Sequence, residues 1–126
     1  MEKILVVDND KEVRELVEVT LAAPGRRVLH AESGKMAIEM TLDQKPDLII
    51  MDIVMPGEIN GIEATRFIKK RQETKDVKII LLTAKVDPSF KKQGAEAGAD
   101  NFFLKPFSPR ELKEKVERTL NNFPDA

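Results

Sequence analysis

The chain has 126 residues, which is the size of one domain and long enough to bury a hydrophobic core without disulfides or structural metals. Its 21 Lys and Arg residues nearly balance 22 Asp and Glu residues, so the net charge of -1 gives no overall field to attract nucleic acid or an acidic membrane. The absence of cysteine excludes disulfides, thiolate catalysis and cysteine-based zinc sites. No apolar run approaches the roughly 20 residues of a membrane span and no signal-peptide pattern follows Met1, so we expect a cytoplasmic location.

The first half of the chain alternates between strand and helix patterns. The apolar run ILVV at 4–7 predicts a strand, and a second strand is predicted at 27–31 and a third at 47–51. The segment between the first two strands has the spacing of an amphipathic helix that ends at Pro24-Gly25: Val13, Leu16, Val17, Thr20 and Leu21. A weaker helix is centred on Met36, Ala37 and Met40. The order predicted so far is strand, helix, strand, helix, strand.

The second half continues the alternation. A third helix is expected from about Ile62 to Arg71, strands are expected at 77–82 and 101–104, and Asp87-Pro88 marks the start of a fourth helix. The run SPRE at 108–111 combines a capping box with proline at the first position of a fifth helix. Several strand runs are apolar on consecutive residues, as in strands covered on both faces of a parallel sheet. The sequence therefore predicts the α/β class, as a (βα)5 doubly wound five-stranded parallel sheet in one domain over residues 1–126.

Polar residues follow four of the predicted strands at the edge where ligand sites of such sheets lie. Asp8 and Asn9 follow the first strand, Asp52 the third, Thr83 the fourth and Lys105 the fifth. Carboxylates brought together repel one another, so this arrangement favours a hard divalent cation with oxygen ligands, and Mg2+ is the usual choice beside phosphate. Asp52 would be a carboxylate nucleophile or a metal ligand, while Thr83 and Lys105 could hold phosphate oxygens.

Some of the polar residues in this region also have an ordinary structural explanation. Asp10 lies between a strand and a helix, and we expect it to be a helix cap. Thr83 taken alone is a common strand residue, and Lys105 before Pro106 could be a solvated lysine. Asp8 and Asp52 differ, because each interrupts a buried apolar run where an unpaired carboxylate would be costly. We therefore favour a functional role for these two carboxylates.

At these residues the sequence resembles the receiver domain of two-component response regulators, the CheY-like family. The resemblance runs from Lys3 to about Asn122 through ILVVD, DLIIMDIVMPG, ILLTA and FLKPFSPREL, in that order. It implies a flavodoxin-like strand order 2-1-3-4-5 and transfer of a phosphoryl group from a sensor histidine kinase or a phosphotransfer protein. It further implies a downstream effector protein or a fused output domain, with no direct contact of this domain with nucleic acid or membrane. The domain would be a signalling switch with self-catalysed phosphoryl transfer and autodephosphorylation rather than a turnover enzyme.

The resemblance also implies a role for each site residue. Asp52 would accept the phosphoryl group, Thr83 and Lys105 would sense it, and Phe102 would hold the aromatic switch position. Receivers commonly hold the Lys-Pro bond that follows the fifth strand in cis. The cation, Mg2+ or another such as Mn2+, would be held by four groups: Asp8, Asn9, Asp52 and the backbone carbonyl of Val54.

The chain departs from the family pattern at Asn9, where a second acid is usual, and in the loop from Pro56 to Gly61, which is one residue longer. Asn9 leaves a second interpretation open, a degenerate receiver that serves as a phosphorylation-independent interaction module. Other classes fit less well. A haloacid-dehalogenase phosphatase needs an aspartate where Val54 stands, a nucleotide carrier needs glycines or hydroxyls after the first strand, and an EF-hand needs a glycine where Val13 stands.

Overall fold

The structure is a computed structural model that describes residues 1–84 and 87–121. Five strands alternate with five helices along the chain, as predicted. The strands are β1 (Glu2–Val7), β2 (Arg26–Ala31), β3 (Leu48–Asp52), β4 (Lys78–Thr83) and β5 (Asn101–Leu104). The helices are α1 (Lys11–Leu21), α2 (Gly34–Gln44), α3 (Gly61–Lys70), α4 (Pro88–Ala97) and α5 (Pro109–Leu120). Within the described residues, none of the helices is long and apolar enough to cross a membrane.

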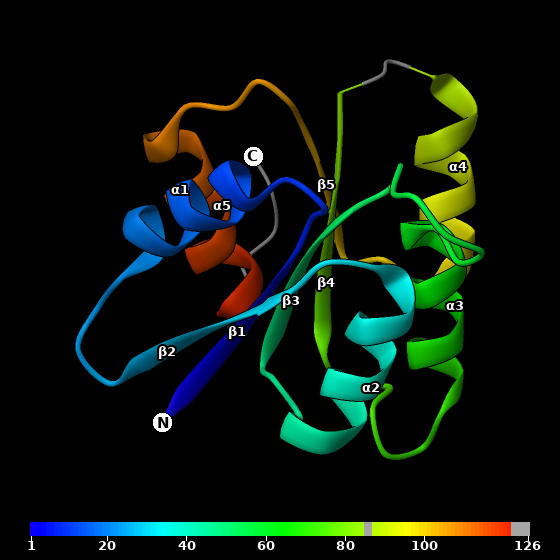
Figure 1. Cartoon of the computed structure of the whole chain (residues 1–126), viewed down its shortest axis with the longest axis horizontal. Coiled ribbons are helices and arrows are strands. Elements are labelled where there is room, and N and C mark those ends of the chain that lie inside the picture. Colours follow the sequence, from blue (N-terminus) through cyan, green and yellow to red (C-terminus); the bar gives the residue numbers. More distant parts are fainter. Residues whose placement is uncertain (85–86, 122–126) are drawn as a thin grey trace.

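The strands form one parallel sheet in the order β2-β1-β3-β4-β5, which confirms the predicted fold class and strand order. Figure 1 shows α1 and α5 on one face of the sheet and α2, α3 and α4 on the other. Each face has its own buried apolar cluster, because successive side chains of a strand point to opposite faces. Both clusters draw on β1, β3 and β4, which explains why these strands are apolar on consecutive residues.

Two strands end one residue later than predicted, and the difference concerns the site. Asp52 is the last residue of β3 and Thr83 is the last residue of β4, whereas the sequence placed both just beyond the strands. Asp52 is paired in register with Leu82, so ladder hydrogen bonds continue through the polar residue. Both side chains are consequently held by regular sheet rather than by a loop.

The buried face of α1 differs from the predicted apolar stripe. Leu16 is 45% exposed, whereas Arg14 is buried together with Val17 and Leu21. These three buried residues lie at positions i, i+3 and i+7, which is the spacing of one helix face. An arginine thus occupies a core-facing position of α1 that helical periodicity alone would assign to an apolar residue.

The predicted helix starts are confirmed. Asp10 caps α1, Asp87 caps α4 and Ser108 caps α5, each by accepting a hydrogen bond from a backbone N–H of the first turn. One cap was missed by the sequence analysis: Asn60 and Glu63 form a reciprocal capping box at the start of α3. This capping box ends the longer loop of the sequence analysis and fixes where α3 begins beside β3.

Candidate functional site

A lysine ammonium joins two carboxylates at the carboxyl edge of the sheet. Lys105 Nζ lies 2.7 Å from Asp8 Oδ2 and 3.4 Å from Asp52 Oδ2. The Lys105 backbone N–H donates to the carbonyl of Thr83, so the residue is anchored beside the end of β4. Three residues that the sequence analysis placed at three strand ends therefore meet, and their ion pairs are mostly shielded from water.

Asp8 is 1% exposed and is held on several sides. Its backbone N–H donates to the carbonyl of Ala31, its carboxylate accepts from the Asp10 N–H and from Lys105, and its own carbonyl accepts from Arg14. Such saturation offsets the cost of burying a carboxylate. The Asp8 side chain is therefore fixed at the edge of the sheet.

Asp52 is also buried, at 6% exposure. Burial raises the pKa of the Asp52 carboxyl above its ordinary value, and the nearby Asp8 charge raises this pKa further, although Lys105 and the Val54 N–H act in the opposite direction. The first residue of α3 is packed tightly against this strand end, since a Cβ on Gly61 would lie 2.2 Å from the Asp52 carbonyl oxygen. Glycine at this position lets α3 begin directly beside Asp52.

The pKa of Lys105 is also raised, but for a different reason from that of Asp52. Burial alone would lower the pKa of Lys105, but the hydrogen bond to Asp8 and the charges of Asp52 and Asp8 raise it above the ordinary lysine value. Lys105 is therefore a permanent cation at neutral pH. It can stabilise negative charge that develops on the Asp52 side chain.

Thr83 and Phe102 lie on the other face of the sheet, toward α4. Phe102 pairs in register with Leu81, and Thr83 follows Leu81 by two residues, so the threonine and the ring are diagonal neighbours on one face. The Phe102 ring belongs to the apolar cluster of that face and contacts Gly94 of α4, where an added Cβ would lie 3.2 Å from Phe102 Cε2. Thr83 itself is 1% exposed.

Two other aromatic residues of this region, Phe103 and Phe107, pack against each other. Phe103 faces the α1 and α5 side of the sheet, opposite to Phe102. Its ring makes an edge contact with Phe107 at 6.0 Å between centroids, so Phe107 is a packing residue. The Lys105-Pro106 bond that separates these residues is cis.

The donors at this edge fit a hard divalent cation by their chemistry, because two carboxylates, the Asn9 amide and the Val54 carbonyl are all oxygen ligands. The Lys105 ammonium already contacts both carboxylates, which shows that a positive charge is accommodated beside them. In the described part of the chain, no group of three or more His, Cys, Asp or Glu side chains could hold a metal. A cation would therefore depend on neutral oxygen donors as well, and Asn9 and Val54 are both exposed.

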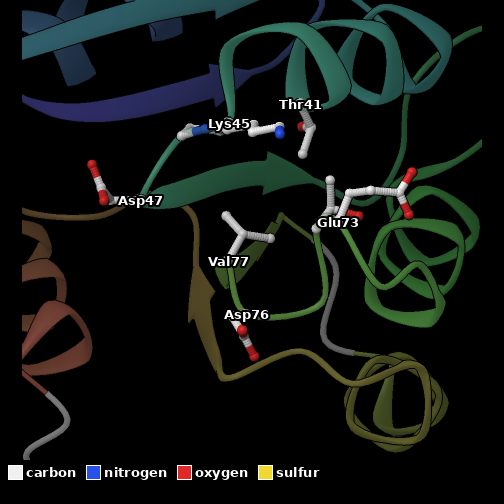
Figure 2. Close-up of a pocket in the computed structure, with 8 residues that line it drawn as sticks. Thr41, Lys45, Asp47, Glu73, Asp76 and Val77 are labelled. Carbon is white, nitrogen blue, oxygen red and sulfur yellow. The ribbon is translucent and has the colours of Figure 1, made fainter.

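A separate cavity of about 230 Å³ opens at the opposite edge of the sheet, near the starts of β3 and β4 (Figure 2). Its buried hydroxyls are already occupied, since Thr41 donates to the Ala37 carbonyl and Thr74 to the Ile68 carbonyl. Figure 2 shows its carboxylates on different sides of the cavity rather than converging. The charged groups that act together lie at the carboxyl edge, and we place the candidate site there.

One polar neighbour of the site was missed by the sequence analysis. Arg14 Nη1 donates to the Asp8 carbonyl at 2.7 Å inside the protein. The signal was present in the sequence, because Arg14 precedes Val17 by three residues and Leu21 by seven. An arginine in that stripe needs a buried acceptor.

The geometry of this fold and site is that of a receiver domain, and comparisons with known proteins agree. Residues 4–117 match the response regulator receiver domain family. The chain is 44% identical over 117 residues to the phosphate regulon transcriptional regulatory protein PhoB of Pseudomonas aeruginosa, covering 93% of this chain and 51% of that protein. It is 42% identical over 118 residues to the transcriptional regulatory protein ResD of Bacillus subtilis, covering 94% of this chain and 48% of that protein.

Solved structures give the same assignment. A putative response regulator from Chloroflexus aurantiacus superposes with a TM-score of 0.88 at 37% identity, covering 95% of this chain and 98% of that chain. The 126-residue chain therefore belongs to the response regulator receiver family of two-component systems. The chain spans about half the length of the curated relatives described above.

The raised pKa of Asp52 gives a prediction about metal-free stability. A carboxyl that holds its proton more readily in the folded chain than in the unfolded chain lowers stability when it is ionised, at pH above its folded pKa. Asp52→Asn is therefore expected to melt at a higher temperature than the wild type at pH 7 in EDTA. The difference should shrink as the pH falls to about 4, where ordinary aspartates also become protonated.

Asp76→Asn is the matched control, because it makes the same chemical change at an exposed position. Surface substitutions usually change stability by less than about 0.5 kcal/mol, so this control should melt close to the wild type. An Asp52→Asn protein that melts no higher than the wild type at pH 7 would contradict the assigned effect of burial.

Proposed function

We propose that this domain is a phosphorylation switch in which Asp52 accepts a phosphoryl group from the phosphohistidine of a sensor histidine kinase or a phosphotransfer protein. The observation that carries the proposal is the contact of Lys105 with both Asp8 and Asp52 at the carboxyl edge of the sheet. A buried carboxylate beside a fixed cation can act as a nucleophile. The negative charge of the phosphoryl group on Asp52 would then lie beside the positive charge of Lys105, which is already in place.

The transfer can be written as a balanced step. An Asp52 carboxylate oxygen forms a bond to phosphorus while the bond between phosphorus and the donor histidine nitrogen breaks, and the imidazole leaves with that electron pair. Lys105 is placed to pair with the phosphoryl oxygens as they approach Asp52. In the later hydrolysis step, water attacks phosphorus and the bond between phosphorus and the Asp52 oxygen breaks. The Asp52 carboxylate is restored and inorganic phosphate leaves.

Mg2+, or a similar cation such as Mn2+, would neutralise part of the phosphoryl charge when bound. The residues proposed to hold it are Asp8, Asn9, Asp52 and the backbone carbonyl of Val54. Asp8 and Asp52 are the two buried carboxylates of the edge, and Asp8 is already locked by hydrogen bonds on both carboxylate oxygens. The protein's own contribution is thus to hold these acceptors in place before the donor arrives.

We propose that the signal leaves the site through Thr83 and Phe102. A dianion on Asp52 would recruit a hydroxyl donor, and Thr83 ends the strand that pairs with β3 at Asp52. A shift of Thr83 would change the space beside Phe102, whose ring lies against Gly94 of α4. The face formed by α4, β5 and α5 would then bind its partner differently in the two states.

The domain would act in the cytoplasm as one receiver unit over residues 1–126, with a separate effector protein or a fused output domain as its target. Two relatives are named transcriptional regulatory proteins, and each is about twice as long as this chain. A single observation favours a second function. Asn9 removes one charge from the metal-binding pair, as in a degenerate receiver that binds partners without being phosphorylated.

The phospho-acceptor is tested by incubating the protein with Mg2+ and acetyl phosphate and recording its intact mass. The wild type is expected to gain one phosphoryl group, because the Asp52 carboxylate lies at the carboxyl edge of the sheet beside the Lys105 ammonium, which can pair with phosphoryl oxygens. Asp52→Ala should gain none, whereas Asp76→Asn should behave as the wild type. A phosphoryl group that persists in Asp52→Ala would exclude Asp52 as the acceptor.

The relay is tested by NMR with beryllofluoride, which binds as a phosphoryl mimic. Amide shift changes in the wild type should spread from Asp52 to α4, β5 and α5, while in Thr83→Val they should stay close to Asp52, because the hydroxyl is lost. Thr41→Val is the matched control, since this buried threonine donates its hydroxyl to the Ala37 carbonyl within α2, at the other edge of the sheet. Wild-type changes confined to residues around Asp52 would favour the degenerate receiver.

Asn9→Asp tests the metal-binding pair. Replacing a neutral amide by a carboxylate should tighten Mg2+ binding about tenfold, or about 1 to 2 kcal/mol after the cost of stripping water from the carboxylate. In EDTA the variant should melt at a lower temperature, because a further acid is added beside Asp8 and Asp52. Amide shift titration with Mg2+ and thermal melting measure the two effects.

Gln72→Glu adds the same charge beyond the end of α3, at the far edge of the sheet, and should leave the Mg2+ affinity unchanged. If Asn9→Asp alters neither the affinity nor the melting temperature, Asn9 lies outside the cation site and Asp8 serves there alone.

A further inference from the structure

Arg14 is a buried cation whose role the proposed phosphorylation chemistry does not explain. It lies on the sheet-facing side of α1 with Val17 and Leu21, and its side chain is 9% exposed. A guanidinium in such a place needs acceptors and a counter-charge, because taking a charge out of water is expensive. Its contacts are therefore informative.

Within residues 1–84 and 87–121, the only acceptor within hydrogen-bond distance of the Arg14 side chain is the backbone carbonyl of Asp8, at 2.7 Å from Nη1. Glu32 lies 4.0 Å from Nη2 and is itself 69% exposed, so it is a weak counter-charge. Nε is buried and has no hydrogen-bond partner among the described residues. Arg14 is thus directed at Asp8 rather than satisfied by a surface ion pair.

The bonded carbonyl belongs to the peptide that joins Asp8 to Asn9. The N–H of Asp8 is already bonded to the carbonyl of Ala31, and the N–H of Asp10 is bonded to the Asp8 carboxylate. Arg14 completes this set by fixing the carbonyl, so the turn from Asp8 to Asp10 is held on both sides of the Asp8-Asn9 peptide. Within residues 1–84 and 87–121, Asn9 makes no hydrogen bond that could orient it in the same way.

We propose that Arg14 is a positioning residue for the cation site, which fixes the Asp8-Asn9 peptide so that both residues offer their oxygens to a divalent cation. The inference rests on the proposed function, because it concerns the residues that would hold Mg2+ there. This positioning matters more for the Asp8-Asn9 pair of this chain than it would for a pair of two acids. A neutral amide gains little Coulomb energy from a cation, so its contribution depends on being held in place.

The charge and the hydrogen bond of Arg14 have opposite effects, which gives the test a definite sign. The positive charge alone opposes the binding of a cation nearby, so its removal would tighten Mg2+ binding. Loss of the hydrogen bond would free the peptide and weaken binding, as removal of groups that orient metal ligands usually does. A purely structural role would lower stability and leave the affinity unchanged.

The experiment compares the wild type with Arg14→Met, Arg14→Lys and Glu32→Gln. Mg2+ affinity is read from the amide shifts of Asn9 and Asp10, and thermal melts in EDTA report stability separately. Arg14→Met is expected to bind Mg2+ about tenfold more weakly, and Arg14→Lys, which keeps the charge but not the planar fork, should lie between it and the wild type. Glu32→Gln is the matched control, because it removes the other partner of Arg14 and should leave the affinity unchanged.

An Arg14→Met protein that folds and binds Mg2+ as tightly as the wild type, or more tightly, would overturn the inference while the proposed function stands. If Arg14→Met does not fold, Arg14→Lys decides: weaker binding than the wild type supports the inference and equal binding overturns it. A wild type that shows no Mg2+-dependent shifts at Asn9 and Asp10 would overturn the proposed cation site and the inference together.

Discussion

The contact of one ammonium with two buried carboxylates is the constraint on which the rest of this structure depends. Lys105 meets Asp8 and Asp52 although the three residues lie far apart in the sequence. Unpaired, each carboxylate would oppose folding at the end of a strand that is otherwise apolar. The pairing requires β1 to lie beside β3 and requires the chain after β5 to cross the end of β4, where the Thr83 carbonyl anchors the Lys105 N–H. The strand order and the site are therefore two aspects of one arrangement.

The alternation of side chains along the strands places the carboxylates of Asp8 and Asp52 on one face of the sheet and Thr83 and Phe102 on the other. Asp8 and Asp52 follow Val6 and Ile50 by two residues, and both of these apolar residues belong to the cluster under α1 and α5. Thr83 and Phe102 have the opposite parity and face α4. The end of β4 is one place where the Asp52 side of the sheet meets the α4 side. Thr83 stands at that end, so the proposed relay through this threonine would run from the Asp52 side of the sheet to the aromatic ring on the other side.

Consecutive apolar runs and capping residues are local signals, and they predicted the order of elements and the parallel (βα)5 class. The strand order 2-1-3-4-5 came from the resemblance to receiver domains. The predicted ends of β3 and β4 were one residue too early. The ladder hydrogen bonds continue through Asp52, and the strand propensity of an aspartate does not indicate this. Leu16 was assigned to the core and Arg14 was overlooked, because periodicity was counted on apolar residues alone. The bridge from Lys105 to Asp8 and the Asn60 capping box depend on tertiary contacts and side-chain reach. The roles of the converging residues remain predictions.

The balance of charge at this edge explains why geometry should decide its affinity for a cation. Two carboxylates, Asp8 and Asp52, face two cations, Lys105 and Arg14, and Asn9 contributes no charge. A divalent ion at this edge is attracted less than it would be if a third acid replaced Asn9, because Lys105 and Arg14 offset the charges of the two carboxylates. Binding is then favoured only if the ligand oxygens are already held in position, so that no further entropy is lost in ordering them. Asp8 meets this condition through its bonds to Asp10, Lys105 and Arg14, and the peptide that leads to Asn9 shares the last of these bonds.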